Sequence, residues 1–114
     1  KMIQVMLDET LSSEEKNRDG SQVRLHCVEE VEAGGRIIIR KGAPVTGKIV
    51  DVVPSGDRKK ALIGFVILKI EAEDGSTIKL SSDRFRLFAE SAGKAVFYQK
   101  GQTFQAELGR GKVR

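Results

Sequence analysis

The sequence predicts a single all-β domain, a barrel or barrel-like sandwich of about seven or eight short, mostly antiparallel strands. Val and Ile together number 20 against eight Leu, a composition typical of sheets. Apolar and polar residues alternate in several short runs, the pattern of half-buried strands. Turn residues separate these runs at short intervals, as in sandwiches and barrels. The 114 residues fit one domain, which we place at residues 1–108, followed by a polar tail at 109–114.

The clearest alternation predicts five strands, each with one apolar and one polar face. They cover residues 3–7, 23–27, 77–80, 84–87 and 104–108. Asp74-Gly75 separates the third of these runs from a long apolar run. Because Asp-Gly suits the two-residue turn of a hairpin, this is the strongest hairpin signal in the chain.

The run 45–53 changes phase within itself. Val45 and Ile49 share one face, whereas Val50 and Val52 lie on the other. A β-bulge near Ile49-Val50 would reconcile the two halves, and bulges are common where a sheet curls into a barrel. The alternative is a strand that is buried on both faces.

The run 61–73 predicts a strand whose even-numbered face is the core, because Lys69, Glu71 and Glu73 place the odd face in water. Its odd face nevertheless carries apolar residues that need a cover, which makes them candidate interaction residues. Another segment of the chain covering them is the favoured interpretation, and a second copy or a partner protein is the alternative. The residues are Ile63, Phe65 and Ile67.

The densest basic run is Arg58-Lys59-Lys60, in a predicted loop of a chain with net charge +4 and a pI near 9.4. Such runs usually serve solubility and edge protection. Contact with phosphates, anionic lipid head groups or an acidic partner is the functional alternative, so Arg58, Lys59 and Lys60 are candidate interaction residues. Aromatic residues make up 5% of the chain and Trp is absent, so stacking platforms are few and we expect no nucleic-acid binding at physiological salt.

No residue pattern predicts a catalytic, cofactor or metal site. His26 and Cys27 are neighbours on a predicted strand, so their side chains point to opposite faces and cannot form a nucleophile–base pair. Cys27 is in phase with Val23 and Leu25, which predicts a core position. The longest apolar run, residues 61–68, is far shorter than the ~20 residues of a membrane-spanning helix.

Two segments repeat the pattern Lys-Gly-x-x-apolar-x-small-x-apolar. They are residues 41–49 and 100–108. The glycine after the lysine permits a positive φ, and the small residue permits close backbone approach. The repeat predicts two similar turns, each leading into a strand.

Part of the chain resembles a known family. Residues 37–47, Ile-Ile-Ile-Arg-Lys-Gly-Ala-Pro-Val-Thr-Gly, are similar to the strand–turn–strand "I-P-K-G-[ST]-x-[VL]-x-G" of the TrbI-like barrel. Arg58, the apolar strand after it and residues 73–80, Glu-Asp-Gly-Ser-Thr-Ile-Lys-Leu, resemble that family's next stretch. The family supplies the scaffold of conjugative and type IV secretion channels in bacterial envelopes, and the pattern also occurs in small exported bacterial proteins. The resemblance covers residues 22–80 and extends to 100–108 through the second Lys-Gly turn.

The resemblance implies a barrel used for assembly in the cell envelope. Arg40 stands where the family has Pro, and no long amphipathic insert separates the strands, so no pore is implied. The function expected is a non-enzymatic envelope module, in the periplasm or cell envelope, that contacts a protein partner or a second copy of itself. The alternative function is a small basic barrel that binds nucleic acid, and the alternative location is the cytoplasm.

Overall fold

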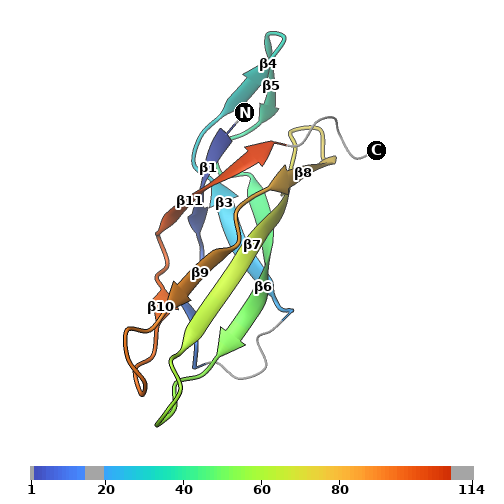
Figure 1. The fold of residues 1–114 in the computed structure, drawn as a ribbon. Coiled ribbons are helices and arrows are strands. Elements are labelled where there is room, and N and C mark those ends of the chain that lie inside the picture. The colour runs from blue at the N-terminus through green and yellow to red at the C-terminus, as the bar shows by residue number, and fades with distance from the viewer. Residues whose placement is uncertain (1, 15–19, 109–114) are drawn as a thin grey trace.

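The computed structural model describes residues 2–14 and 20–108, and these form an all-β barrel without helices (Figure 1). The predicted tail at 109–114 lies outside the described residues. Within the part described, no helix is long and apolar enough to cross a membrane. The strands are β1 (Met2–Leu7), β2 (Leu11–Ser12), β3 (Gln22–Cys27), β4 (Val31–Ala33), β5 (Arg36–Ile39), β6 (Pro44–Val53), β7 (Leu62–Glu71), β8 (Thr77–Ser81), β9 (Phe85–Phe88), β10 (Phe97–Tyr98) and β11 (Thr103–Leu108).

Six antiparallel strands close the barrel wall. Their order is β6-β3-β1-β11-β8-β7, and β7 pairs back onto β6. β9 adds to β7 as a seventh strand of the same sheet, so the predicted count of seven or eight matches this sheet. The pairs β2–β10 and β4–β5 form two small sheets, and the β4–β5 hairpin projects from one end of an elongated molecule of 56 × 24 × 18 Å (Figure 1).

The barrel wall divides into two halves, β1-β11-β8 and β3-β6-β7, whose first two strands pair in the same register. Ile3 of β1 faces Ala106 of β11, and Val23 of β3 faces Gly47 of β6. The other four cross-strand pairs of β1 with β11 match those of β3 with β6 in the same way. β1 and β3 pair with each other at the centre of this arrangement, where Met6 faces His26.

The repeated Lys-Gly segments are the turns that begin the second strand of each half. The amide of Gly42 donates a 2.7 Å hydrogen bond to the carbonyl oxygen of Cys27, and that of Gly101 donates a 2.9 Å bond to the carbonyl oxygen of Leu7. The φ angles of the two glycines are 90° and 96°, a region that side-chain-bearing residues rarely adopt. The prediction of two similar turns is therefore confirmed.

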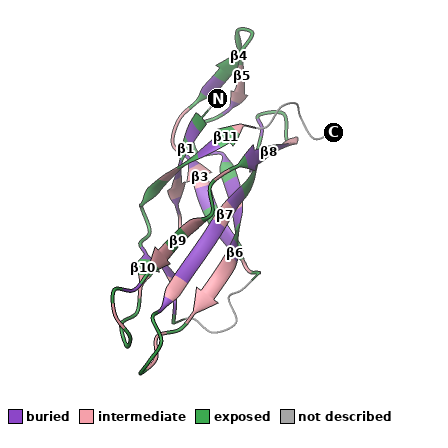
Figure 2. Ribbon diagram, in the orientation of Figure 1, coloured by how far each residue is buried: buried purple, intermediate pink, exposed green. Residues whose placement is uncertain are grey.

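The core lies inside the barrel and is purple in Figure 2. Inward-facing residues alternate along β1 and β3, as predicted, and Cys27 is fully buried among them. Four aromatic rings fill the space between β7, β9, β10 and β11 with centroid separations of 4.9–5.4 Å. They belong to Phe65, Phe85, Tyr98 and Phe104.

The predicted bulge in residues 45–53 is confirmed. Ile49 faces Phe65 and Asp51 faces Gly64, so Val50 is an extra residue in β6. The extra residue turns Val52 inward, where it packs against the core after the bulge as Ile49 does before it.

The predicted phase of residues 61–73 is wrong before Leu68. Ile63, Phe65 and Ile67 have exposed fractions of 0–2% because they line the barrel interior. A second bulge explains the error: Thr46 faces Lys69 and Gly47 faces Ile67, so Leu68 is an extra residue in β7. Lys69 and Glu71 lie beyond that bulge and do not report the phase before it.

The strand therefore has no surplus apolar face. The chain itself buries Ile63, Phe65 and Ile67, which was the favoured interpretation, but as the centre of the core instead of a second layer. These three residues therefore offer no surface to a partner. Leu62, Val66 and Leu68, which were expected in the core, are half-buried or exposed on the outer wall.

Candidate functional site

The predicted basic run lies at the end of the barrel opposite the β4–β5 hairpin, on the loop 54–61 between β6 and β7 (Figure 1). Arg58, Lys59 and Lys60 are all exposed, and no ion pair joins them to another described residue. The loop is a tight turn in which the backbones of Gly56 and Lys59 exchange two 3.3 Å hydrogen bonds. The three cations are therefore presented together to solvent.

A second loop, residues 89–96, lies against the first. The amide of Ala89 donates a 2.9 Å hydrogen bond to the carbonyl oxygen of Ala61. A Cβ placed on Gly93 would lie 4.0 Å from the carbonyl oxygen of Gly56. These contacts bring exposed Lys94 to the end of the barrel that carries the basic run.

Glu14 ties the loop 54–61 to the strand β2. Its carboxylate accepts hydrogen bonds from the amide and hydroxyl of Ser55, at 2.9 and 2.6 Å, and from the hydroxyl of Ser13 at 2.7 Å. These donors favour the charged form, so the pKa of Glu14 is below its usual range. Ser13 is fully buried and exchanges hydrogen bonds with the backbone of Val96, which anchors the second loop as well.

Two exposed phenylalanines belong to the same end. Phe88 ends β9 and is 60% exposed, and Phe97 begins β10 and is 48% exposed. Phe88 faces Leu62, the residue that follows the loop 54–61, across the ladder between β9 and β7. We call the set Arg58, Lys59, Lys60, Phe88, Lys94 and Phe97 the basic end.

The basic end combines cations with apolar rings. Two exposed carboxylates, Asp57 and Glu90, lie on the same loops, and the Glu14 carboxylate is hydrogen-bonded to one of these loops, so four cations face three carboxylates. Exposed large apolar side chains cost free energy in water, about 25 cal/mol per Å² of surface, and rarely gather without a function. The arrangement suits an acidic surface that also offers apolar contacts.

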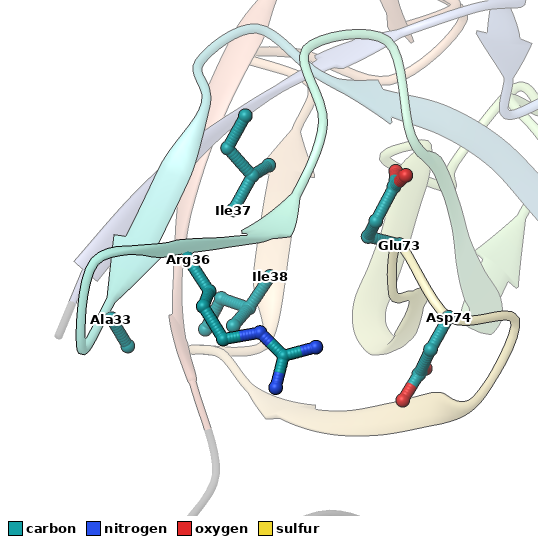
Figure 3. A pocket seen from close by; sticks show the side chains of 6 residues that line it. All are labelled: Ala33, Arg36, Ile37, Ile38, Glu73 and Asp74. Carbon is teal, nitrogen blue, oxygen red and sulfur yellow. The ribbon is translucent and has the colours of Figure 1, made fainter.

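Another cleft, of about 350 Å³, lies between the β4–β5 hairpin and the turn after β7 (Figure 3). Its acidic residues are engaged in holding the fold. Glu73 pairs with Arg40, and Asp74 accepts hydrogen bonds from the amide and hydroxyl of Ser76 at 2.9 and 2.5 Å. Ala33, Arg36 and the half-buried Ile37 and Ile38 complete the lining, and we assign this cleft no chemistry.

His26 and Cys27 lie on opposite sides of the barrel wall, as predicted. His26 is half-exposed and its Nδ1 lies 2.5 Å from a carboxylate oxygen of Asp8. Cys27 is buried, and desolvation raises the pKa of its thiol. Among residues 2–14 and 20–108, no cluster of His, Cys, Asp and Glu could hold a metal ion.

No protein-family model, curated protein or solved structure matches this chain. The resemblance to the TrbI-like barrel therefore remains a prediction from the sequence.

Sequence reasoning found three members of the basic end and missed the other three. Lys94, Phe88 and Phe97 come from a loop and two strands remote in sequence from residues 58–60. One local signal was present for Phe88, because it follows Leu87 directly and breaks the alternation of residues 84–87. Lys94 and Phe97 carry no such signal.

Proposed function

We propose that this protein is a non-enzymatic assembly module of the bacterial cell envelope that docks an acidic partner protein through the basic end. The exposure of Phe88 and Phe97 at the end of the barrel that carries four cations is the observation on which the proposal rests. Interfaces are enriched in aromatic residues at their centres, with charged residues at their rims. Glu14 and Ser13 accept hydrogen bonds from Ser55 and Val96, which anchors one end of each loop and lowers the ordering cost of docking.

The envelope location rests on the family resemblance of residues 22–80. Fractionation of the source cells tests it separately from docking. We expect the native protein in the periplasmic or membrane fraction. Recovery with cytosolic markers would contradict the location and leave the docking surface to its own test.

Charge reversal at the basic end tests docking. Crosslinking in native cells followed by purification should recover a partner protein with the wild type. The amount of that partner recovered with the variant R58E/K59E/K60E should be at least tenfold lower. The matched control K48E/K69E/K79E carries the same change in charge on the exposed outer wall and should retain that partner. Equal loss in both variants, or no loss in either, contradicts docking at this end. Circular dichroism establishes that both variants are folded.

Single-stranded nucleic acid is the second candidate partner. Exposed aromatic rings beside cations are the arrangement that such proteins use to stack bases and hold phosphates. The sequence-based reason against this activity was a shortage of aromatic platforms, and Phe88 and Phe97 supply two. Sub-micromolar binding of an oligonucleotide at about 150 mM salt, lost in R58E/K59E/K60E, would favour this function over protein docking.

A further inference from the structure

The equivalence between the two halves of the barrel fails at one edge. β6 pairs with β3 on one side and with β7 on the other, where Val45 faces Ile70 and Gly47 faces Ile67. β11 pairs with β1 in the same way on one side. On its other side, β11 pairs with β8 only at Glu107 and Leu108. The edge from Thr103 to Ala106 has no strand partner among the described residues.

The strand facing this edge is also incomplete. β9 stands at the end of the sheet order, so its outer edge is without a partner strand in the described part of the chain. A cleft of about 480 Å³ lies beside β9 and β11, with Phe85, Gln105 and Glu107 in its lining. The rings of Phe85 and Phe104, with centroids 4.9 Å apart, close the core here instead of backbone hydrogen bonds. We call this gap the open slot.

We propose that the open slot accepts an extended segment of a partner protein, which adds a strand at the free edges of β11 and β9. Unpaired main-chain donors and acceptors bind extended peptides by strand addition, and pockets for alternate side chains provide specificity. The equivalent place in the other half of the barrel is occupied by residues 67–70 of β7. Among the described residues, the slot is therefore the one position where the half that contains β6 has a neighbouring strand and the half that contains β11 has none.

The charge of the slot identifies the chemistry of the segment. Asp83 and Glu107 line the cleft, both are exposed, and neither pairs with a described cation. No Lys or Arg contributes to the lining. In the equivalent stretch of β7, Ile67 and Ile70 face inward, and the outward-facing Leu68 and Lys69 lie between them. The expected segment alternates apolar and basic residues. This proposal concerns a different surface from the basic end and does not depend on docking there.

A peptide titration followed by NMR tests the proposal. The probe is an eight-residue peptide of alternating Lys and Val, compared with one of alternating Glu and Val. The Lys peptide should shift the amide signals of residues 83–88 and 103–107 and bind about tenfold more tightly, because two ion pairs replace two repulsions. The Lys peptide with methylated amide nitrogens should not bind. Equal affinity for both charged peptides, or undiminished binding after methylation, overturns the proposal.

Charge exchange in the protein provides the control. The variant D83K/E107K should reverse the preference and bind the Glu peptide more tightly. The control E32K/E71K, with the same charge change at exposed carboxylates away from the slot, should keep the preference of the wild type. An unchanged preference in D83K/E107K refutes the slot as the binding site. Concentration-dependent shifts at the same amides without peptide would instead assign the slot to a second copy of the chain.

Discussion

Leu7 and Cys27 occupy equivalent positions at the ends of β1 and β3, each hydrogen-bonded through its carbonyl oxygen to the glycine of a Lys-Gly turn. Their amides complete the match, since Leu7 donates to Gln102 at 2.9 Å and Cys27 donates to Ala43 at 3.0 Å. Each residue also points into the core with an exposed fraction of 0–1%. The ends of the two central strands are thus fixed by the same device.

We predict that Cys27 reacts slowly with thiol reagents in the folded protein. It is buried, its thiol lies 3.1 Å from the carbonyl oxygen of Glu29, and its raised pKa keeps it protonated at neutral pH. Replacement by Ser buries a more polar group, so C27S should lower the free energy of unfolding by about 1–3 kcal/mol. Native labelling as fast as labelling in denaturant would show that this position is open.

Truncation of Phe65 should be among the most destabilising changes. Phe65 is fully buried and contacts three other rings with centroids 5.0–5.3 Å away. F65A should lower the free energy of unfolding by about 3–5 kcal/mol, measured by urea denaturation. F88A removes a ring that is 60% exposed and should cost under about 0.5 kcal/mol. Similar losses in the two variants would contradict the placement of Phe65 at the centre of the core.

Gly47 is required for a close approach between strands. A Cβ at this position would lie 2.6 Å from the backbone carbonyl oxygen of Val66 in β7. That oxygen cannot move without shifting the strand, so G47A should cost about 1–3 kcal/mol or more. The equivalent residue in the other half is Ala106, whose methyl group is already accommodated there. The matched variant at that position is A106G, which removes a methyl group where G47A adds one. A stable G47A variant would indicate that β6 and β7 are farther apart than described.

The hydrogen bonds that Ser55 donates to the Glu14 carboxylate should depend on pH. A carboxylate with a lowered pKa is fully charged above its ordinary value of 4.5, and the hydrogen bonds are lost only as the pH falls through the lowered value. The amide shift of Ser55 should therefore titrate with a midpoint below 4.5, and E14Q should abolish that titration. A midpoint at or above 4.5 would mean that the carboxylate does not hold the loop.

The strand pattern could be predicted because alternation is local. β1, β3, β8 and β11 each keep a period of two. The bulge at Val50 is indicated by a phase change between apolar residues. The bulge at Leu68 has no such signal, because every residue from Phe65 to Leu68 is apolar and both faces of the strand look alike before the bulge. Chemical type alone could not tell which face of that strand is the core.

The candidate sites depend on contacts between segments far apart in the chain. The basic end forms because a hydrogen bond from Ala89 to Ala61 joins its two loops, and no local sequence pattern predicts that bond. The open slot exists because β8 pairs with β11 at only two positions, and the sequence does not show where that pairing ends. The Lys-Gly repeat did indicate equivalent turns, but the missing strand becomes visible only when the two halves are compared in register.

Photo-crosslinking from position 97 tests the central claim, docking at the basic end, most directly. A photoreactive phenylalanine analogue at Phe97 should give one discrete crosslinked protein species in native cells, and that species should disappear in R58E/K59E/K60E. The same analogue at Leu68, which is apolar and 40% exposed on the outer wall, should give none. Crosslinks of equal yield from both positions, or a product at Phe97 that persists after charge reversal, would contradict docking at this end.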